Sequence, residues 1–213
     1  WSDDGRCCRV YSRKEVSTMM KIYGDLGSGN CLKVKWTAEY LKIPYQWIDV
    51  DIMAGESRTP EFLAMNPAGQ VPTVVLDDGT PLTQSNAITS YLAENTPLFP
   101  ADPYLRARIN AWLFWEQNSH EFFVAGCRFH MVYLGKSKAT RDPMRVERGE
   151  EALDHMEQAL TGKEWLVGDH ITLADIALVA YTRVAHEGGF DLSTRPSVHA
   201  WIVRCEQTLG LAG

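Results

Sequence analysis

The feature that most constrains the fold is a change of sequence pattern at Pro97, Pro100 and Pro103. Before these prolines, short apolar runs alternate with helical patterns in the predicted order β-α-β-α-β-β-α. After them, the apolar patterns all have a helical period, so an α/β domain followed by an all-α domain is predicted. The predicted division is an irregular N-terminal extension at 1–19, an α/β domain at 20–96, a linker at 97–103 and a helical domain at 104–213.

The composition excludes several functional classes. Of 213 residues, 45% are hydrophobic and 23% are charged, as in an ordinary globular protein. The formal net charge of −6 disfavours a nucleic-acid partner, and no apolar run approaches the ~18 residues of a membrane span. The five cysteines are odd in number and match no zinc pattern, which favours reduced thiols, a cytoplasmic location and no metal site.

The first domain begins with a predicted βαβ unit. Residues 20–24 form a strand-like run that ends in a glycine-rich turn, and residues 45–51 predict a second strand. A helix lies between them, so the two strands should be parallel. The apolar positions of that helix recur at helical spacing: Cys31, Val34, Ala38 and Leu41.

Two features of the following segment bear on ligand binding. The apolar run at 71–76 and the turn signal at 78–79 predict a hairpin. Pro72 would remove a ladder hydrogen bond from its strand, so a proline at this position needs a reason. A cis peptide bond before Pro72 would supply one, because it would turn the backbone of Val71 toward a ligand. Ser85 is the expected N-cap of the next helix, and the free N–H groups there also favour a carboxylate.

The helical domain offers fewer chemical signals. The stretch from Thr172 to Asp175 fits a capping box, which we interpret as a fold-stabilising element without a catalytic role. Trp112, Trp115 and Phe122 could line an aromatic substrate pocket, but helical spacing favours the core. Helical patterns are found at 104–126, at 144–160, at 173–184 and after Pro196.

The stretch Ser28-Gly29-Asn30-Cys31 opens the first helix. A helix N-terminus favours a thiolate, whether it belongs to the protein or to a ligand. Three interpretations stay open on these residues alone. The Ser28 hydroxyl could activate another molecule's thiol, the Cys31 thiol could react itself, or the stretch could be only a turn and a cap.

Taken together, these motifs resemble the cytosolic glutathione transferase family over residues 20–209. The matching stretches, in order, are "SGNCLKV", "TPEFLAMNPAGQVP", "SNAIT", the proline-marked linker and "ITLADIA". The resemblance implies a thioredoxin-like N-terminal domain, a helical C-terminal domain and a homodimer. Within the family, the sequence most resembles bacterial-type members that use a serine. The loop "DLGSGNC" is not a clean phi, theta or zeta signature, so the class stays unassigned.

The resemblance also implies roles for particular residues. Ser28 matches the serine that stabilises the glutathione thiolate, whereas Tyr23 precedes the turn and is a less suitable donor. The Ser-x-x-Cys spacing places Cys31 one turn inward, where we expect a buried, unreactive thiol. The resemblance also implies six binding residues. These are Arg58 and Gln70 near the glycyl carboxylate, Val71 and Pro72 at the cysteinyl unit, and Gln84 and Ser85 at the γ-glutamyl end.

The implied activity is attack of the glutathione thiolate on a hydrophobic, electrophilic small molecule, with glutathione as cosubstrate and no further cofactor. Two alternatives remain open. One is a glutathione-dependent disulfide reductase or peroxidase that uses the same site. The other is a non-catalytic binding protein that has kept the fold. The resemblance does not name the electrophile, and it leaves detoxification, catabolism and redox repair open as physiological roles.

Overall fold

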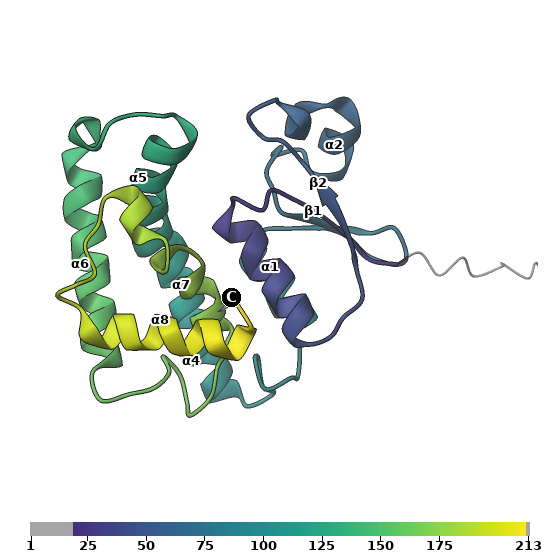
Figure 1. Ribbon diagram of the computed structural model, residues 1–213. Coiled ribbons are helices and arrows are strands. Elements are labelled where there is room, and N and C mark those ends of the chain that lie inside the picture. The colour runs from purple at the N-terminus through teal and green to yellow at the C-terminus, as the bar shows by residue number, and fades with distance from the viewer. Residues whose placement is uncertain (1–18, 212–213) are drawn as a thin grey trace, which may run out of the picture.

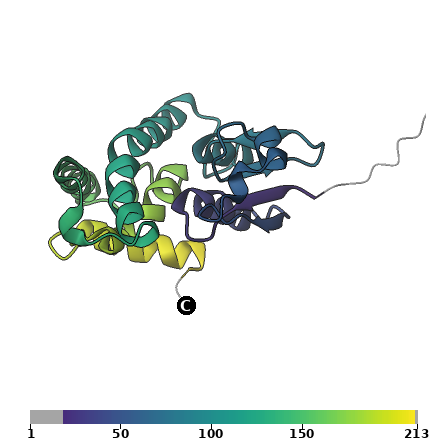
Figure 2. The ribbon, with the colours of Figure 1, turned by 90° about the horizontal axis from the view of Figure 1, so that it is seen from above.

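The computed structural model describes residues 19–211, so the expectation for the N-terminal extension lies outside it except at Met19. An α/β part and a helical part lie side by side, and α1 is on the side of the sheet that faces the helices (Figures 1 and 2). The elements of the first part are β1 (Lys21–Gly24), α1 (Gly29–Tyr40), β2 (Gln46–Asp49), the 3-10 helix η1 (Glu56–Arg58), α2 (Pro60–Met65), β3 (Thr73–Val75), β4 (Pro81–Thr83) and α3 (Ser85–Leu92).

The four strands form one sheet in the order β2-β1-β3-β4. The βαβ unit makes β1 and β2 parallel, as predicted, and Ile22 pairs with Trp47. The hairpin makes β3 and β4 antiparallel, with Val74 opposite Leu82. The thioredoxin-like order of elements predicted from the sequence is confirmed.

The second part is helical throughout its regular structure. Its elements are α4 (Pro103–Trp115), the π-helix η2 (Glu116–Ala125), α5 (Gly126–Arg128), the π-helix η3 (Phe129–Tyr133), the 3-10 helix η4 (Lys138–Thr140), α6 (Pro143–Leu160), α7 (Leu173–Thr182), the 3-10 helix η5 (Ala185–Gly188) and α8 (Pro196–Leu209). The division into domains at residues 97–103 stays a prediction.

The helix expected at 104–126 changes to π-helical hydrogen bonding at Glu116. In an α-helix, residues five apart point in widely different directions, whereas the i→i+5 pattern brings them closer to one face. Glu116 and Glu121 are five apart, and both carboxylates lie within 3.3 Å of the Lys33 ammonium. The π-helix therefore allows one lysine to meet two carboxylates.

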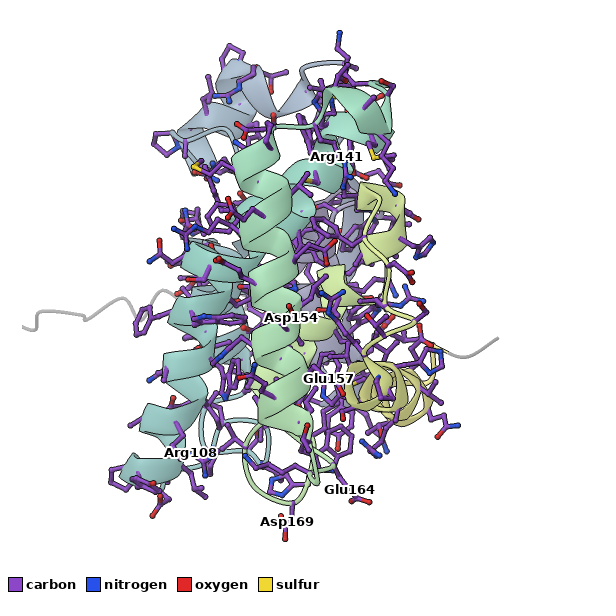
Figure 3. All side chains as sticks on the ribbon, turned by 90° about the vertical axis from the view of Figure 1, so that its left-hand side faces the viewer. Arg108, Arg141, Asp154, Glu157, Glu164 and Asp169 are labelled. Atoms are coloured by element: carbon purple, nitrogen blue, oxygen red, sulfur yellow. The ribbon has the colours of Figure 1, made fainter. Side chains whose placement is uncertain are left out.

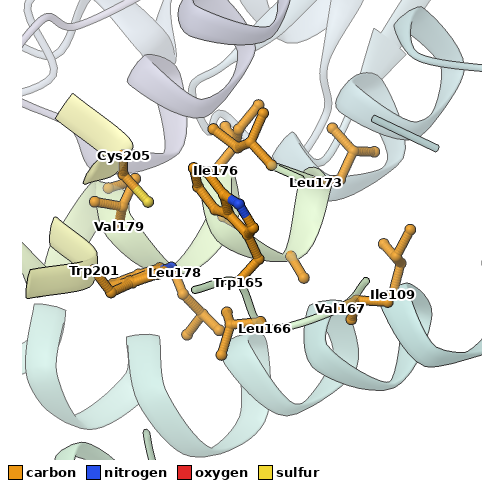
Figure 4. Close-up of a cluster of buried hydrophobic side chains, with 14 of the residues drawn as sticks. Ile109, Trp165, Leu166, Val167, Leu173, Ile176, Leu178, Val179, Trp201 and Cys205 are labelled. Carbon is orange, nitrogen blue, oxygen red and sulfur yellow. The ribbon is translucent and has the colours of Figure 1, made fainter. Parts of the chain in front are cut away.

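Helix α7 is the centre of the helical part. The sequence showed one apolar stripe, but every residue of Leu173–Thr182 is buried, because α7 is enclosed by α1, α4 and α8. Figure 4 shows part of the surrounding cluster, including Ile176, Trp165 and Trp201. The expected capping box is present, and the Asp175 carboxylate also accepts hydrogen bonds from Leu166 N and Trp201 Nε1.

Ion pairs and caps hold the outer helices together. Figure 3 looks onto α6 and labels Asp154 and Glu157 on it. Asp154 pairs with Arg195 at 2.7 Å, and Glu157 accepts a hydrogen bond from Val198 N in the first turn of α8. A carboxylate at a helix N-terminus satisfies free N–H groups and the helix dipole. The start of α8 is thereby fixed against α6.

Helix α1 packs on two sides. Val34 and Ala38 belong to a core with Ile22 and Val74 of the sheet. Trp36 belongs instead to the core around α7. The N-terminus of α1 is therefore held at the boundary between the two parts, which places Ser28 beside side chains of the helical part.

Candidate functional site

The residues singled out from the sequence meet at one cavity of about 520 Å³. They reach it from the start of α1, from η1, from the segment before β3 and from the start of α3. Three residues of the helical part, Gln117, Glu121 and Phe129, complete one side of the lining. All seven predicted site residues line this cavity: Ser28, Arg58, Gln70, Val71, Pro72, Gln84 and Ser85.

Ser28 is the N-cap residue of α1, but its side chain makes no capping hydrogen bond. Ser28 is half-buried at the cavity, and its hydroxyl also interacts with the Tyr181 hydroxyl and the Cys31 thiol. Nearby, Asn30 N donates to the Tyr181 hydroxyl over 3.2 Å. Burial raises the pKa of Tyr181, so this hydroxyl stays protonated in neutral solution. The Ser28 hydroxyl thus lines the cavity beside a helix N-terminus, which suits an anionic sulfur, whereas the buried Tyr181 is not among the residues that line it.

Cys31 is fully buried on the stripe with Val34 and Ala38, as predicted. Burial raises the pKa of its thiol to about 11, even though Asp25 N donates to Sγ over 3.4 Å. A thiol with this pKa is almost entirely protonated at neutral pH and therefore a poor nucleophile. Cys31 is not among the residues that line the cavity.

The Val71–Pro72 peptide bond is cis, which confirms the expectation from the sequence. Pairing in β3 begins only at Thr73, so Val71 lies outside the ladder and its backbone borders the cavity. Gln70 and Arg58 are exposed at the same cavity, and Arg58 Nη1 donates to Ala68 O over 3.1 Å. These groups can offer a ligand both backbone and side-chain hydrogen bonds.

The expectation that Ser85 caps α3 is wrong. Gln84 is the N-cap residue, with φ of +70°, and Ser85 is the first helical residue. The Ser85 hydroxyl donates to Asn30 Oδ1 over 3.0 Å instead of serving its own helix. No side chain caps α3 within the described residues, so its first N–H groups are open to a carboxylate.

A buried polar network, which reasoning from the sequence did not predict, lies behind the cavity. The Lys33 ammonium contacts Glu116 Oε1 at 2.8 Å, and both side chains have no exposed surface. It also donates to Asn30 Oδ1 over 2.8 Å, while Asn30 Nδ2 donates to Glu121 Oε1 over 2.6 Å. Two carboxylates face one ammonium here, so the network carries net negative charge next to the cavity.

The aromatic side chains are arranged differently from the expectation. Trp112 and Trp115 pack against the core, as favoured by their spacing, but Phe122 is 52% exposed. The aromatic residue that reaches the cavity is Phe129, which reasoning from the sequence did not single out. Tyr23 packs edge-on against Phe62 and does not line the cavity.

In the part of the chain that the structure describes, no group of three or more His, Cys, Asp or Glu side chains is placed to hold a metal ion. None of the helices described within residues 19–211 has the length and apolar character needed to cross a bilayer.

Comparison with known proteins agrees with this geometry. Residues 27–95 match the family model described as "Glutathione S-transferase, N-terminal domain", and residues 122–208 match "Glutathione S-transferase, C-terminal domain". A glutathione S-transferase from Pseudomonas fluorescens is 46% identical, with 89% of this chain and 95% of that chain covered and a TM-score of 0.85.

Two further structures extend the comparison. A glutathione S-transferase from Xanthobacter autotrophicus is 44% identical over 88% of this chain and 92% of that chain, with a TM-score of 0.83. Ure2p in complex with glutathione is 25% identical over 92% of this chain and 99% of that chain, with a TM-score of 0.82. The two domain matches and these similarities show that the chain belongs to the glutathione S-transferase family.

Proposed function

We propose that the protein catalyses attack of the glutathione thiolate on an electrophilic small molecule. The observation that carries the proposal is the convergence of two helix N-termini, those of α1 and α3, on one cavity. Neither N-cap side chain caps its own helix, although Asn30 N in the first turn of α1 donates to the Tyr181 hydroxyl. Such ends favour anions, and glutathione brings both a thiolate and a carboxylate. In the reaction the sulfur forms a bond to the electrophile, and either a leaving group departs or an addition product forms.

Each residue has a proposed role. The Ser28 hydroxyl donates a hydrogen bond to the glutathione sulfur and favours its charged form. The backbone of Val71 pairs with the cysteinyl unit, beside cis-Pro72. Gln84, Ser85 and the open N-terminus of α3 hold the γ-glutamyl carboxylate.

The remaining parts of the cavity complete the proposal. Arg58 and Gln70 serve the glycyl carboxylate, with the Arg58 guanidinium supplying positive charge. Glu121 is part of the negatively charged network and serves the γ-glutamyl ammonium. Phe129 and Ile52 offer apolar surface at the cavity, where a hydrophobic electrophile can lie against them.

Two substitutions at the start of α1 test the chemistry. Raising the thiolate population from a few per cent to most of the molecules is worth about tenfold in rate. Ser28→Ala should therefore raise the pKa of bound glutathione and lower conjugation of an aryl halide about 10- to 100-fold. Cys31→Ala, the matched control two positions into the same helix, should change activity little. Disulfide exchange that depends on Cys31, with negligible conjugation throughout, would instead establish the reductase alternative.

Glutathione binding is tested separately from catalysis. The protein should be retained on immobilised glutathione and eluted by free glutathione, because the cavity contacts do not depend on the electrophile. Retention without activity toward aryl halides, epoxides, peroxides or mixed disulfides would favour the non-catalytic binding alternative. Failure of retention would contradict the proposed site itself.

We also propose a symmetric homodimer. Tyr91 on α3 and Phe114 on α4 are 57% and 74% exposed, and both helices border a second, largely apolar pocket. The Asn86 Oδ1 atom at this pocket is buried without a hydrogen-bond partner among the described residues. A second copy could bury this surface across a two-fold axis. Light scattering that gives the mass of a single 24.0 kDa chain at micromolar concentration would contradict the dimer.

A further inference from the structure

The loop of residues 25–28 connects β1 to α1 and carries Ser28. A hydrogen bond joins the two ends of this loop, because Ser28 N donates to Asp25 O over 3.0 Å. Gly27 N donates to Asp25 Oδ1 over 2.7 Å, which is an Asx turn. The loop consists of Asp25, Leu26, Gly27 and Ser28, and its one apolar side chain, Leu26, is 52% exposed. The loop therefore has no anchor of its own in the core, and its position depends on contacts with other segments.

Two side chains of the helical part hold this loop. The Tyr133 hydroxyl donates to Asp25 Oδ2 over 3.0 Å, so both carboxylate oxygens of Asp25 are engaged. Arg128 Nη1 donates to Gly27 O over 2.8 Å. Arg128 is itself fixed, because its Nε pairs with Glu187 Oε2 at 2.6 Å. The helical part therefore contacts the loop at Asp25 and at Gly27, on both sides of Leu26.

The Tyr133 side chain contacts the loop closely and also packs against a residue of the cavity. A Cβ atom added to Gly27 would lie 2.6 Å from the Tyr133 hydroxyl oxygen, so only glycine permits this approach. Phe129, which lines the cavity, stacks on Tyr133 with 5.2 Å between ring centroids. Burial, together with the charge of Asp25, raises the pKa of Tyr133 to about 12. The hydroxyl therefore keeps its proton and acts as a donor at neutral pH.

We propose that Tyr133 and Arg128 are positioning residues that hold the Ser28 loop against the helical domain and thereby aim the Ser28 hydroxyl at the glutathione sulfur. This inference deepens the proposed function and rests on it. The other proposed glutathione contacts belong to other segments and come from Arg58, Gln70, Val71, Gln84, Ser85 and Glu121. Loosening the loop should therefore impair the chemical step much more than glutathione binding.

The test is Tyr133→Phe, which removes one hydroxyl and keeps the ring that stacks on Phe129. The matched control is Tyr45→Phe, because the Tyr45 hydroxyl also donates to a carboxylate, Glu39 Oε1, over 3.0 Å, and does not border the cavity. In Tyr133→Phe we expect kcat for conjugation to fall about tenfold and KM for glutathione to change less than about twofold. The pKa of the bound glutathione thiol should rise by about one unit.

Asp25→Asn provides a second variant. It keeps an oxygen for Gly27 N and weakens the bond from Tyr133 by removing its charge, so we expect a smaller change of the same sign. A purely structural role for Tyr133 would lower the unfolding midpoint without moving the thiol pKa. If kcat and the thiol pKa of Tyr133→Phe match those of Tyr45→Phe, the proposal is overturned.

Amide hydrogen exchange tests the clamp without glutathione. The amides of residues 25–30 should exchange faster in Tyr133→Phe than in Tyr45→Phe, because the loop loses a contact to the helical part. Equal exchange rates in the two variants would overturn the clamp even if the parent protein proved unable to bind glutathione. Failure of the parent to bind glutathione would contradict the proposed function and leave the exchange comparison as the test of the clamp.

Discussion

Removing the Lys33 ammonium should destabilise the protein more than any substitution at a surface lysine. Lys33 Nζ lies 2.8 Å from Glu116 Oε1, and neither side chain has exposed surface. In Lys33→Met the Glu116 carboxylate would stay buried with only neutral donors, Asn86 Nδ2 at 3.1 Å and Gln117 Nε2 at 2.9 Å. Those two hydrogen bonds cannot replace a full positive charge in a buried site.

The expected loss in the free energy of unfolding follows from the burial of both side chains. Breaking a buried ion pair by removing one partner costs about 3–5 kcal/mol, a large part of the ~5–15 kcal/mol that stabilises a typical domain. Lys33→Met should lower the free energy of unfolding by that amount. Adding Glu116→Gln removes the uncompensated charge, so the double variant should recover about 1–3 kcal/mol relative to Lys33→Met.

The assay is urea unfolding followed by tryptophan fluorescence, at one salt concentration, for the parent, both single variants and the double variant. Lys35→Met is the matched control on the same helix. Lys35 pairs with Glu39 four residues on, but the two side chains are 27% and 45% exposed. This control should cost about 0.5 kcal/mol or less. Strictly additive losses at Lys33 and Glu116, or a Lys33→Met loss no larger than that of the control, would refute the reasoning.

Two further predictions concern buried titratable groups. Burial, with the nearby charge of Lys33, lowers the pKa of His120 from 6.5 to about 3. The unfolded chain then binds a proton that the folded protein does not, so stability should be complete above pH 6.5 and fall toward pH 3 by up to about 1.4 kcal/mol per pH unit. Urea titrations at a series of pH values should show a shallower dependence of stability on pH in His120→Gln than in the parent. Burial also raises the pKa of Cys31 to about 11, so iodoacetamide at pH 8 should label Cys31 only after unfolding, and rapid labelling of the native protein, read by mass spectrometry, would contradict this.

The parts of the fold that could be predicted are those encoded locally. The βαβ unit follows from an apolar run, a glycine-rich turn and a helical stripe within 30 consecutive positions, 21–50. The capping box at Thr172 is likewise complete within four residues. The hairpin followed from the apolar run at 71–76 and the turn signal at 78–79. Short-range signals of this kind do not depend on which distant segment packs against them.

The parts that could not be predicted depend on distant partners. Lys33 looks like a solvent-exposed helical lysine, and its burial becomes clear only when Glu116, 83 residues later in the sequence, is brought to it. Ser85 is a residue type that is common at the N-cap, but its hydroxyl donates to the Asn30 side chain, 55 residues away in the sequence. In both cases a tertiary contact outweighs a local preference, which is common for polar residues near a ligand site.

The helical part therefore completes the lining of the candidate cavity. Asn30, which meets Ser85 beside the cavity, is held by Lys33 and Glu121, and Lys33 in turn needs Glu116. The Ser28 loop is held by Tyr133 and Arg128 of the helical part. If residues 20–96 were separated from the rest, the Lys33 ammonium would lose both carboxylates and the loop would lose both of its clamps. The anion-binding end of α1 would remain, but its polar side chains would no longer have fixed directions. The properties that we assign to Ser28 thus depend on the contacts between the α/β part and the helical part.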